Sequence, residues 1–207
     1  MINPFTFYSQ SPQTIAYAVL VGVVTVTLHS WILAALTWLA GDRGPRQDGR
    51  LTLSPTRAAS PISLLSITFT QIGWIRPMQI TPRALRGGAV SLLPLLLISL
   101  ALLALFAQSL MHLRPLIAHT FPGAMPAYVT MALIDAFRRT VFWYVAFNLL
   151  PIPPFLMGHL WLWRGQPIWM KSAPIGRCIA LIAFVTLVTV TVSYRANLIQ
   201  IELALLR

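Results

Sequence analysis

The sequence predicts an all-α protein, a polytopic bundle of transmembrane helices that forms a single membrane domain over residues 1–207. Of the 207 residues, 57% are hydrophobic and only 9% are charged, and the mean hydropathy is +0.74. One soluble core of this length does not need so much apolar surface. The apolar residues also gather into about four blocks long enough to cross a bilayer, and most basic residues fall between these blocks.

The first span is predicted over residues 16–40, which contain no formal charge and reach roughly 37 Å as a helix. Residues 41–60 form a polar, arginine-rich loop that we expect to be cytoplasmic. Within it, residues 49–55 alternate between apolar and polar side chains, which is typical of a strand or a small β-hairpin arm. The next apolar stretch is too short for a full crossing, which favours a re-entrant or short segment over residues 61–82.

Four elements are expected from residue 89 onward: a second and a third span, an interfacial segment and a last span. A second span over residues 89–113 and a third over 127–150 are the two strong apolar runs, and a run of prolines ends the third. Residues 155–177 are basic and rich in tryptophan, as in an interfacial segment. The last span is predicted over 178–200. The side chains expected at headgroup level are those of Trp161, Trp163 and Trp169.

The formal net charge is +11, and the positions of the basic residues predict orientation rather than nucleic-acid binding. No basic patch is interleaved with aromatic residues, so we expect no nucleic-acid partner. With four crossings, ten basic residues fall on the cytoplasmic side and two clearly outside, which predicts an external N-terminus. We expect the protein in a bacterial inner (cytoplasmic) membrane. Cys178 is the single cysteine, which excludes an internal disulfide or a thiolate metal cluster.

Three motifs occur in the same order as in a known family. Gly41-Asp42 is followed by GRLTLSP at 49–55, GWIRPMQITPR occupies 73–83, and NLLPIPP occupies 148–154. Together they resemble the site-2 protease family of intramembrane zinc metalloproteases, over roughly residues 16–160. The resemblance implies a site-2 protease-like helical core.

The same resemblance implies a degenerate active site. The family's HExxH motif falls on residues 29–33, so that His29 is retained, Ser30 replaces the catalytic glutamate and Leu33 replaces the second histidine. The aspartate ligand of the family falls on Leu156. Zinc hydrolysis needs about three protein ligands and a base, and leucine offers no lone pair. We therefore expect no catalytic residue, no bound metal and no cofactor.

The remaining histidines leave alternatives open. His112 and His119 are predicted on the outer side and His159 on the inner side, so a relocated metal site is the less favoured interpretation. For His29, the simplest expectation is a hydrogen bond to a neighbouring helix. A cofactor ligand or a proton relay remains an alternative.

Three charged residues lie near the middle of the third predicted span. Asp135 can meet Arg138 or Arg139 on one helix face, which leaves one positive charge over. Either the helix sits shallower and this arginine snorkels, or an acid, carbonyl, lipid phosphate or cofactor carboxylate satisfies it. We hypothesise that the arginine pair, with Asn148 on the same helix, faces a partner, so that Arg138→Leu or Arg139→Leu loosens assembly.

These inferences predict a catalytically inactive accessory or scaffold subunit of a multi-subunit membrane complex, such as an energy-transducing one. Its expected partners are membrane lipids and other transmembrane subunits, held by helix, lipid or cofactor binding. Two alternatives stay open. One is an intramembrane metalloprotease with unconventional ligands, and the other is a regulatory pseudoprotease that captures transmembrane helices.

Overall fold

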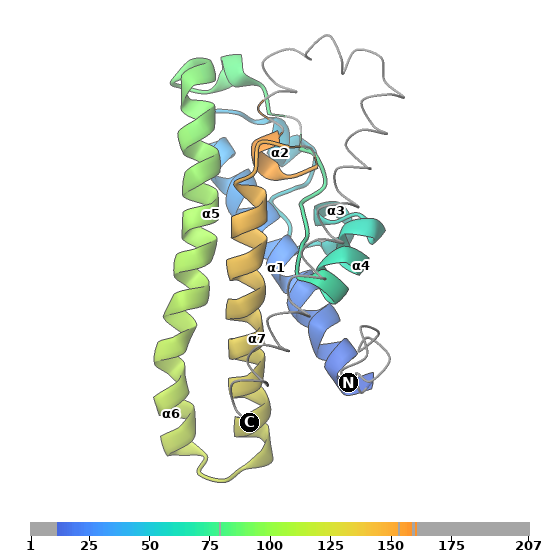
Figure 1. Cartoon of the computed structure of the whole chain (residues 1–207). Helices are drawn as coiled ribbons and strands as arrows, with labels where there is room; N and C mark the ends of the chain where they lie inside the picture. The colour runs from blue at the N-terminus through green and yellow to red at the C-terminus, as the bar shows by residue number, and fades with distance from the viewer. Residues whose placement is uncertain (1–11, 79, 153, 159, 161–207) are drawn as a thin grey trace, which may run out of the picture.

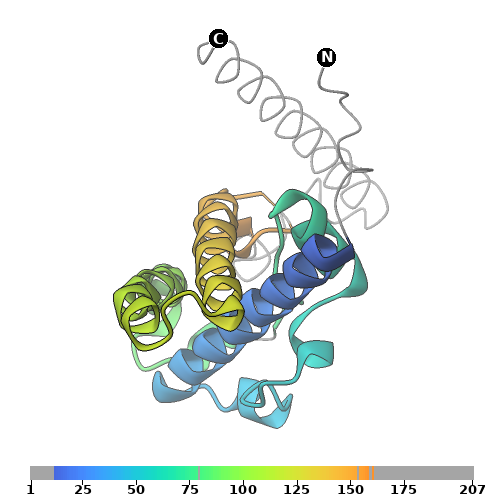
Figure 2. The same ribbon diagram turned by 90° about the horizontal axis from the view of Figure 1, so that it is seen from below.

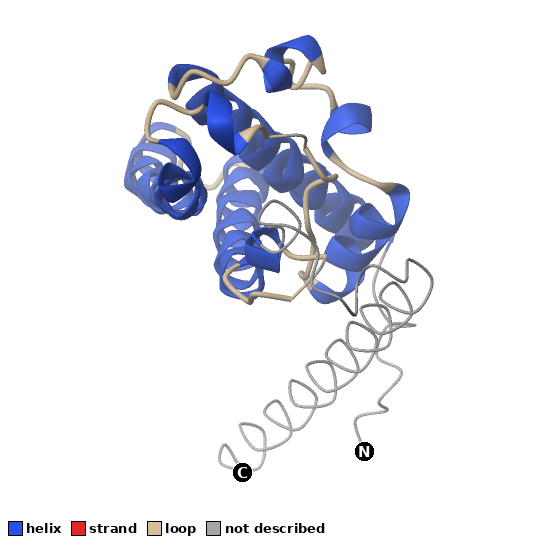
Figure 3. Cartoon of the chain, turned by 90° about the horizontal axis from the view of Figure 1, so that it is seen from above, coloured by secondary structure: helices blue, strands red, loops and turns tan. Residues whose placement is uncertain are grey.

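The structure is a computed structural model that describes residues 12–78, 80–152, 154–158 and 160. Over these residues the chain is mostly helical and contains no strand (Figure 3). The α-helices are α1 (Pro12–Leu39), α2 (Gly44–Gln47), α3 (Pro55–Ala58), α4 (Pro61–Thr70), α5 (Leu92–Ser109), α6 (Leu113–Thr120) and α7 (Met125–Asn148). Short 3-10 turns are η2 (Pro82–Ala84), η3 (Gly88–Ser91), η4 (Leu110–His112) and η5 (Leu156–Gly158).

Two helical stretches have the length and apolarity of a membrane span, namely Pro12–Leu39 and Gly88–Thr120. They indicate membrane association and coincide with the first and second predicted spans. The third predicted span is helix α7, which carries three charged side chains. The fourth predicted span, 178–200, lies outside the described residues, as does most of the interfacial segment, with Trp161, Trp163 and Trp169.

Helix α1 lies at the centre of the fold. It packs against α4 on one side and against α5 and α7 on the other, and α5 and α7 run side by side (Figures 1 and 2). An apolar sequence on all faces suits this position, because a helix that is hydrophobic all round is buried by other helices or by lipid. Its buried residues include several polar ones, His29 among them.

Helix α4 has ten residues, and the segment that follows it runs back to the beginning of the helix. Ser60 caps its first turn, with the Ser63 N–H donating to the Ser60 hydroxyl at 3.2 Å. The helix ends at Gln71, whose φ of 61° is left-handed. Six residues past Thr70, the Arg76 N–H donates to the Ala58 carbonyl at 2.8 Å, beside the beginning of α4.

Glycine lets α4 approach its neighbours closely. A Cβ at Gly22 of α1 would lie 2.7 Å from Ile67 of α4, and a Cβ at Gly73 would lie 2.8 Å from the same side chain. Ile67 is 2% exposed and is therefore held between α1 and the returning segment. Small residues at such a contact allow two backbones to pack tightly.

The predicted strand or hairpin arm at residues 49–55 is wrong. The segment is a turn around Gly49, whose φ is 65°, followed by helix α3. The Arg50 guanidinium donates to the Arg57 carbonyl and, at 3.0 Å, to the Pro77 carbonyl. These bonds hold the segment as a compact loop, and no strand is available within the described chain to pair with it.

Candidate functional site

His29 lies on α1 at the centre of the bundle and is completely buried. Its Nδ1 is 2.7 Å from the Tyr144 hydroxyl of α7, and its Nε2 is 3.3 Å from the Ser99 hydroxyl of α5. The rings of His29 and Tyr144 meet edge to face, with centroids 5.3 Å apart and planes at 82°. A single histidine therefore links three helices through polar contacts, as the sequence analysis expected in outline.

The directions of these hydrogen bonds follow from the proton count. The Ser99 hydroxyl donates its one proton to the Leu96 carbonyl at 2.7 Å, so it can only accept from the imidazole. Nε2 therefore carries the proton, and Nδ1 accepts from the Tyr144 hydroxyl. Both ring nitrogens of His29 are engaged within the protein, and neither presents a free lone pair.

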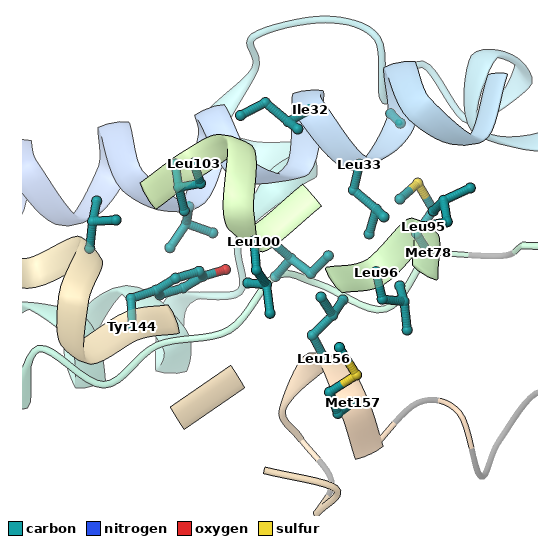
Figure 4. Packing of buried hydrophobic residues seen from close by; sticks show 14 of the residues in the cluster. Ile32, Leu33, Met78, Leu95, Leu96, Leu100, Leu103, Tyr144, Leu156 and Met157 are labelled. Carbon is teal, nitrogen blue, oxygen red and sulfur yellow. The ribbon is translucent and has the colours of Figure 1, made fainter. Parts of the chain in front are cut away.

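Two further positions that the sequence analysis aligned with zinc ligands are apolar and buried. Leu33 is 0% exposed and Leu156 is 1% exposed, and both belong to the main hydrophobic cluster, which also includes Tyr144. Figure 4 shows Leu33 from α1 and Leu156 from η5 around the same interior as Leu96 of α5. Ser30 is also buried. The structure thus brings Leu33 and Leu156 to one apolar interior.

The remaining histidines do not join this interior. His112 and His119 are exposed, in η4 and α6, and His159 lies outside the described residues. Within the part of the chain that the structure describes, no three His, Cys, Asp or Glu side chains are grouped so that they could hold a metal ion.

Asn148 forms hydrogen bonds within the protein, and its predicted contact with a partner stays a prediction. It is fully buried at the end of α7. Its amide nitrogen donates to the Gly73 carbonyl at 2.9 Å and to the Tyr144 carbonyl at 2.8 Å. Its amide oxygen accepts from the Leu156 N–H at 3.1 Å. The side chain therefore ties α7 to the returning segment and to η5, which carries Leu156.

The predicted pairing of Asp135 with an arginine of its own helix is wrong. The Asp135 carboxylate lies 3.2 Å from the guanidinium of Arg114 on α6. Arg138 and Arg139 are exposed, and neither forms an ion pair with a described residue. The ion pair therefore joins α6 to α7, and spacing along α7 alone does not select the partner of Asp135.

These four charged side chains share one cavity between α5, α6 and α7. Its volume is about 770 Å³, and Gln108 contributes a further polar group. The rest of the lining is apolar and comes from α5 and α7, including Leu105 and Phe142. With three arginines and one aspartate, the formal charge of the lining is +2.

Sequence reasoning missed three contributors to these sites, Tyr144, Ser99 and Arg114. Tyr144 and Ser99 are polar side chains inside apolar helical stretches, and such residues tend to seek partners on neighbouring helices. That signal marks both as candidates. Nothing local pairs them with His29, which is 115 and 70 residues away along the chain.

Comparison with known proteins indicates a metalloprotease-like relationship. The chain is similar to the "Putative zinc metalloprotease YwhC" of Bacillus subtilis (strain 168), with 28% identity over 162 residues. The match covers 74% of this chain and 70% of that protein. No protein-family model matches the sequence, and no solved structure matches it.

Proposed function

We propose that the chain is a catalytically inactive, site-2 protease-like membrane protein that acts by binding, as an accessory or scaffold subunit of a larger membrane complex. The observation that carries the proposal is that no side chain at the three positions aligned with the family's zinc ligands offers a free lone pair. His29 uses both ring nitrogens internally, and Leu33 and Leu156 fill their positions with hydrocarbon.

Metal chemistry at this place would require large changes. A zinc site of the family's type needs about three lone-pair donors and an open position for water. Coordination through Nδ1 of His29 would break the buried bond from Tyr144 and leave its hydroxyl unpaired, which is costly in an apolar interior. Coordination through Nε2 would require a different tautomer. Ser30 has no carboxylate with which to activate a water molecule.

The surface of the helices suits a binding role within the bilayer. Large apolar side chains of α5 remain exposed, such as Leu97, Leu102 and Leu105, at 42%, 41% and 65%. Since the same helix passes for a membrane span, lipid or another transmembrane helix is the natural neighbour of this face. We propose four crossings, an external N-terminus and a bacterial inner membrane on the sequence arguments above.

The zinc content of the purified chain tests whether the protein lacks the metal ion that hydrolysis would require. Purified in mild detergent, the wild-type protein should hold well under one zinc per chain, and His29→Leu should not change that value. About one zinc per chain that disappears in His29→Leu would favour the second candidate function. That candidate, an intramembrane metalloprotease with unconventional ligands, is supported by the similarity to a protein named as a zinc metalloprotease.

A gain-of-function series tests whether the leucines mark former ligand positions. Leu33→His and Leu156→Asp, combined with Tyr144→Phe to free Nδ1 of His29, should create a zinc site, and added zinc should raise the unfolding temperature of this variant. Leu33→Asn and Leu156→Asn with Tyr144→Phe is the matched control, because it adds polar groups without a histidine–aspartate ligand set. Equal responses of the two variants to zinc would contradict the assignment of these positions.

The identity and stoichiometry of the proteins that co-purify distinguish an accessory subunit from a regulatory pseudoprotease. Mass spectrometry of the protein purified from its native membrane should find the same transmembrane subunits at fixed stoichiometry. Substoichiometric, single-span proteins that vary with growth condition would favour capture of transmembrane helices instead. A chain recovered alone in several mild detergents would contradict the scaffold role.

A further inference from the structure

We infer that the cavity between α5, α6 and α7 binds the phosphate group of an anionic membrane phospholipid. This inference rests on the proposed role as a membrane-embedded binding protein and narrows that role to one ligand class. It also assigns Arg138 and Arg139, hypothesised above to face a partner, to a lipid headgroup.

The charges in the cavity favour an anion. Arg114 is already paired with Asp135 at 3.2 Å, whereas Arg138 and Arg139 form no ion pair with a described residue. Asp135 is the one acidic side chain in the lining. Two guanidinium groups on consecutive residues can bring two positive charges and several N–H donors to a phosphate, and the attraction of an anionic lipid to each basic side chain is mainly electrostatic.

The depth of the cavity favours the headgroup level of a bilayer. The helical stretch Gly88–Thr120 has 33 residues, which span about 50 Å against a hydrocarbon core of about 30 Å. A span that begins at Gly88 therefore leaves the hydrocarbon after about 20 residues, near Gln108. Arg114 then lies beyond the hydrocarbon, and so does Asp135, to which it is bonded.

This placement explains how α7 tolerates its charges. The α6 end of the long stretch and the first turns of α7 extend together beyond the α1–α4 part of the fold (Figure 1). Arg138 lies about one helical turn from Asp135 along α7, so both arginines can reach the phosphate layer by extending their side chains. The shallow position considered in the sequence analysis is thus the one that the helix lengths favour.

The apolar part of the lining distinguishes a lipid from a free anion. Phe142 and Leu105, which line the cavity next to the charged residues, are 66% and 65% exposed. A site for a soluble phosphate gains nothing from such side chains. A phospholipid places its acyl chains along them while its phosphate meets the arginines.

Native mass spectrometry of the full-length chain in detergent tests the inference with three ligands. Phosphatidylglycerol should bind as one saturable adduct, and more tightly than phosphatidylcholine, whose choline group offsets the phosphate charge. Glycerol 3-phosphate, which has the phosphate without acyl chains, should not displace the lipid. Displacement at comparable concentration would identify a soluble phosphate as the ligand and overturn the lipid assignment.

Substitutions of arginine residues test whether the bound phosphatidylglycerol occupies this cavity. In Arg138→Gln/Arg139→Gln, affinity for phosphatidylglycerol should fall about 25-fold, from about fivefold for each arginine. Arg43→Gln/Arg46→Gln removes two exposed arginines at and within α2, which lie outside the lining of the cavity, and should change affinity less than about twofold. Arg138→Lys/Arg139→Lys keeps the charge and should retain most of the binding, which guards against a folding defect in the glutamine variant.

Equal affinities in the two glutamine variants would overturn the inference, as would loss of binding in the lysine variant while the protein remains folded. The assay uses the isolated chain and no partner protein. Its failure would therefore leave the zinc and subunit tests of the proposed function unaffected.

Discussion

Replacing Tyr144 with phenylalanine removes one hydroxyl group and tests the hydrogen-bond chain through His29. In the wild-type protein this hydroxyl donates to Nδ1 of His29 over 2.7 Å, and both side chains are completely buried. Phenylalanine keeps the ring and its edge-to-face contact with the imidazole. The substitution therefore leaves the packing nearly intact but leaves Nδ1 of His29, a buried acceptor, without its donor.

The expected loss of stability is about 1–2 kcal/mol. A buried acceptor left without its donor costs about 1–3 kcal/mol in soluble proteins. Hydrogen bonds between membrane helices average about 0.6 kcal/mol and reach about 1.7 kcal/mol. The short distance and full burial place this bond at the strong end of that range. In His29→Leu/Tyr144→Phe neither end of the His29–Tyr144 bond remains unpaired, and the contact with Ser99 is lost equally in His29→Leu alone, so the two losses should fall short of additivity by about 1 kcal/mol.

The free energy of unfolding can be measured by titrating SDS into mixed micelles. Tyr128→Phe is the matched control, because Tyr128 lies on the same helix α7 but is 57% exposed. The control should change stability by less than about 0.5 kcal/mol. Equal effects of Tyr144→Phe and Tyr128→Phe, or strict additivity in the double variant, would show that the His29 ring is not held in this way.

Three further outcomes are expected. Asn148→Ala should lower the free energy of unfolding by about 2–4 kcal/mol, because three internal hydrogen bonds are lost together; unchanged SDS resistance would contradict this. Gly22→Ala should cost about 1–3 kcal/mol by overpacking against Ile67, and adding Ile67→Val should recover part of it, whereas a purely additive loss would count against the contact. Asp135→Asn should change stability by less than about 1 kcal/mol, because its ion pair with Arg114 is partly exposed. The same substitution removes the negative charge from the cavity and should strengthen binding of phosphatidylglycerol several-fold in the lipid assay. Weaker binding would refute the charge argument.

Much of the helical layout could be predicted from local sequence. The first apolar block, 16–40, corresponds to α1 (Pro12–Leu39), and the block at 127–150 corresponds to α7 (Met125–Asn148). Hydropathy succeeds here because a long run of apolar side chains is by itself a strong signal for a buried or membrane-embedded helix. The alternation at 49–55 failed as a strand signal because a strand needs a pairing edge, whereas Arg50 found carbonyl groups in its own loop.

The charged cluster shows where spacing arguments stop. Separations of three and four residues correctly place Asp135 near Arg138 and Arg139 on α7. The actual partner is Arg114, which belongs to α6. Which cation reaches the carboxylate depends on how α6 folds back along α7, and no property of the α7 sequence contains that information.

The sequence by itself determined the positions of the apolar helices and the absence of coordinating atoms at Leu33 and Leu156, because hydropathy and coordinating ability belong to individual side chains. Only the tertiary structure decided that Tyr144 and Ser99 occupy both nitrogens of His29, that Asn148 is internal, and that Arg138 and Arg139 line a cavity. Each of these depends on distances between segments that lie far apart along the chain, and those distances are set by helix packing.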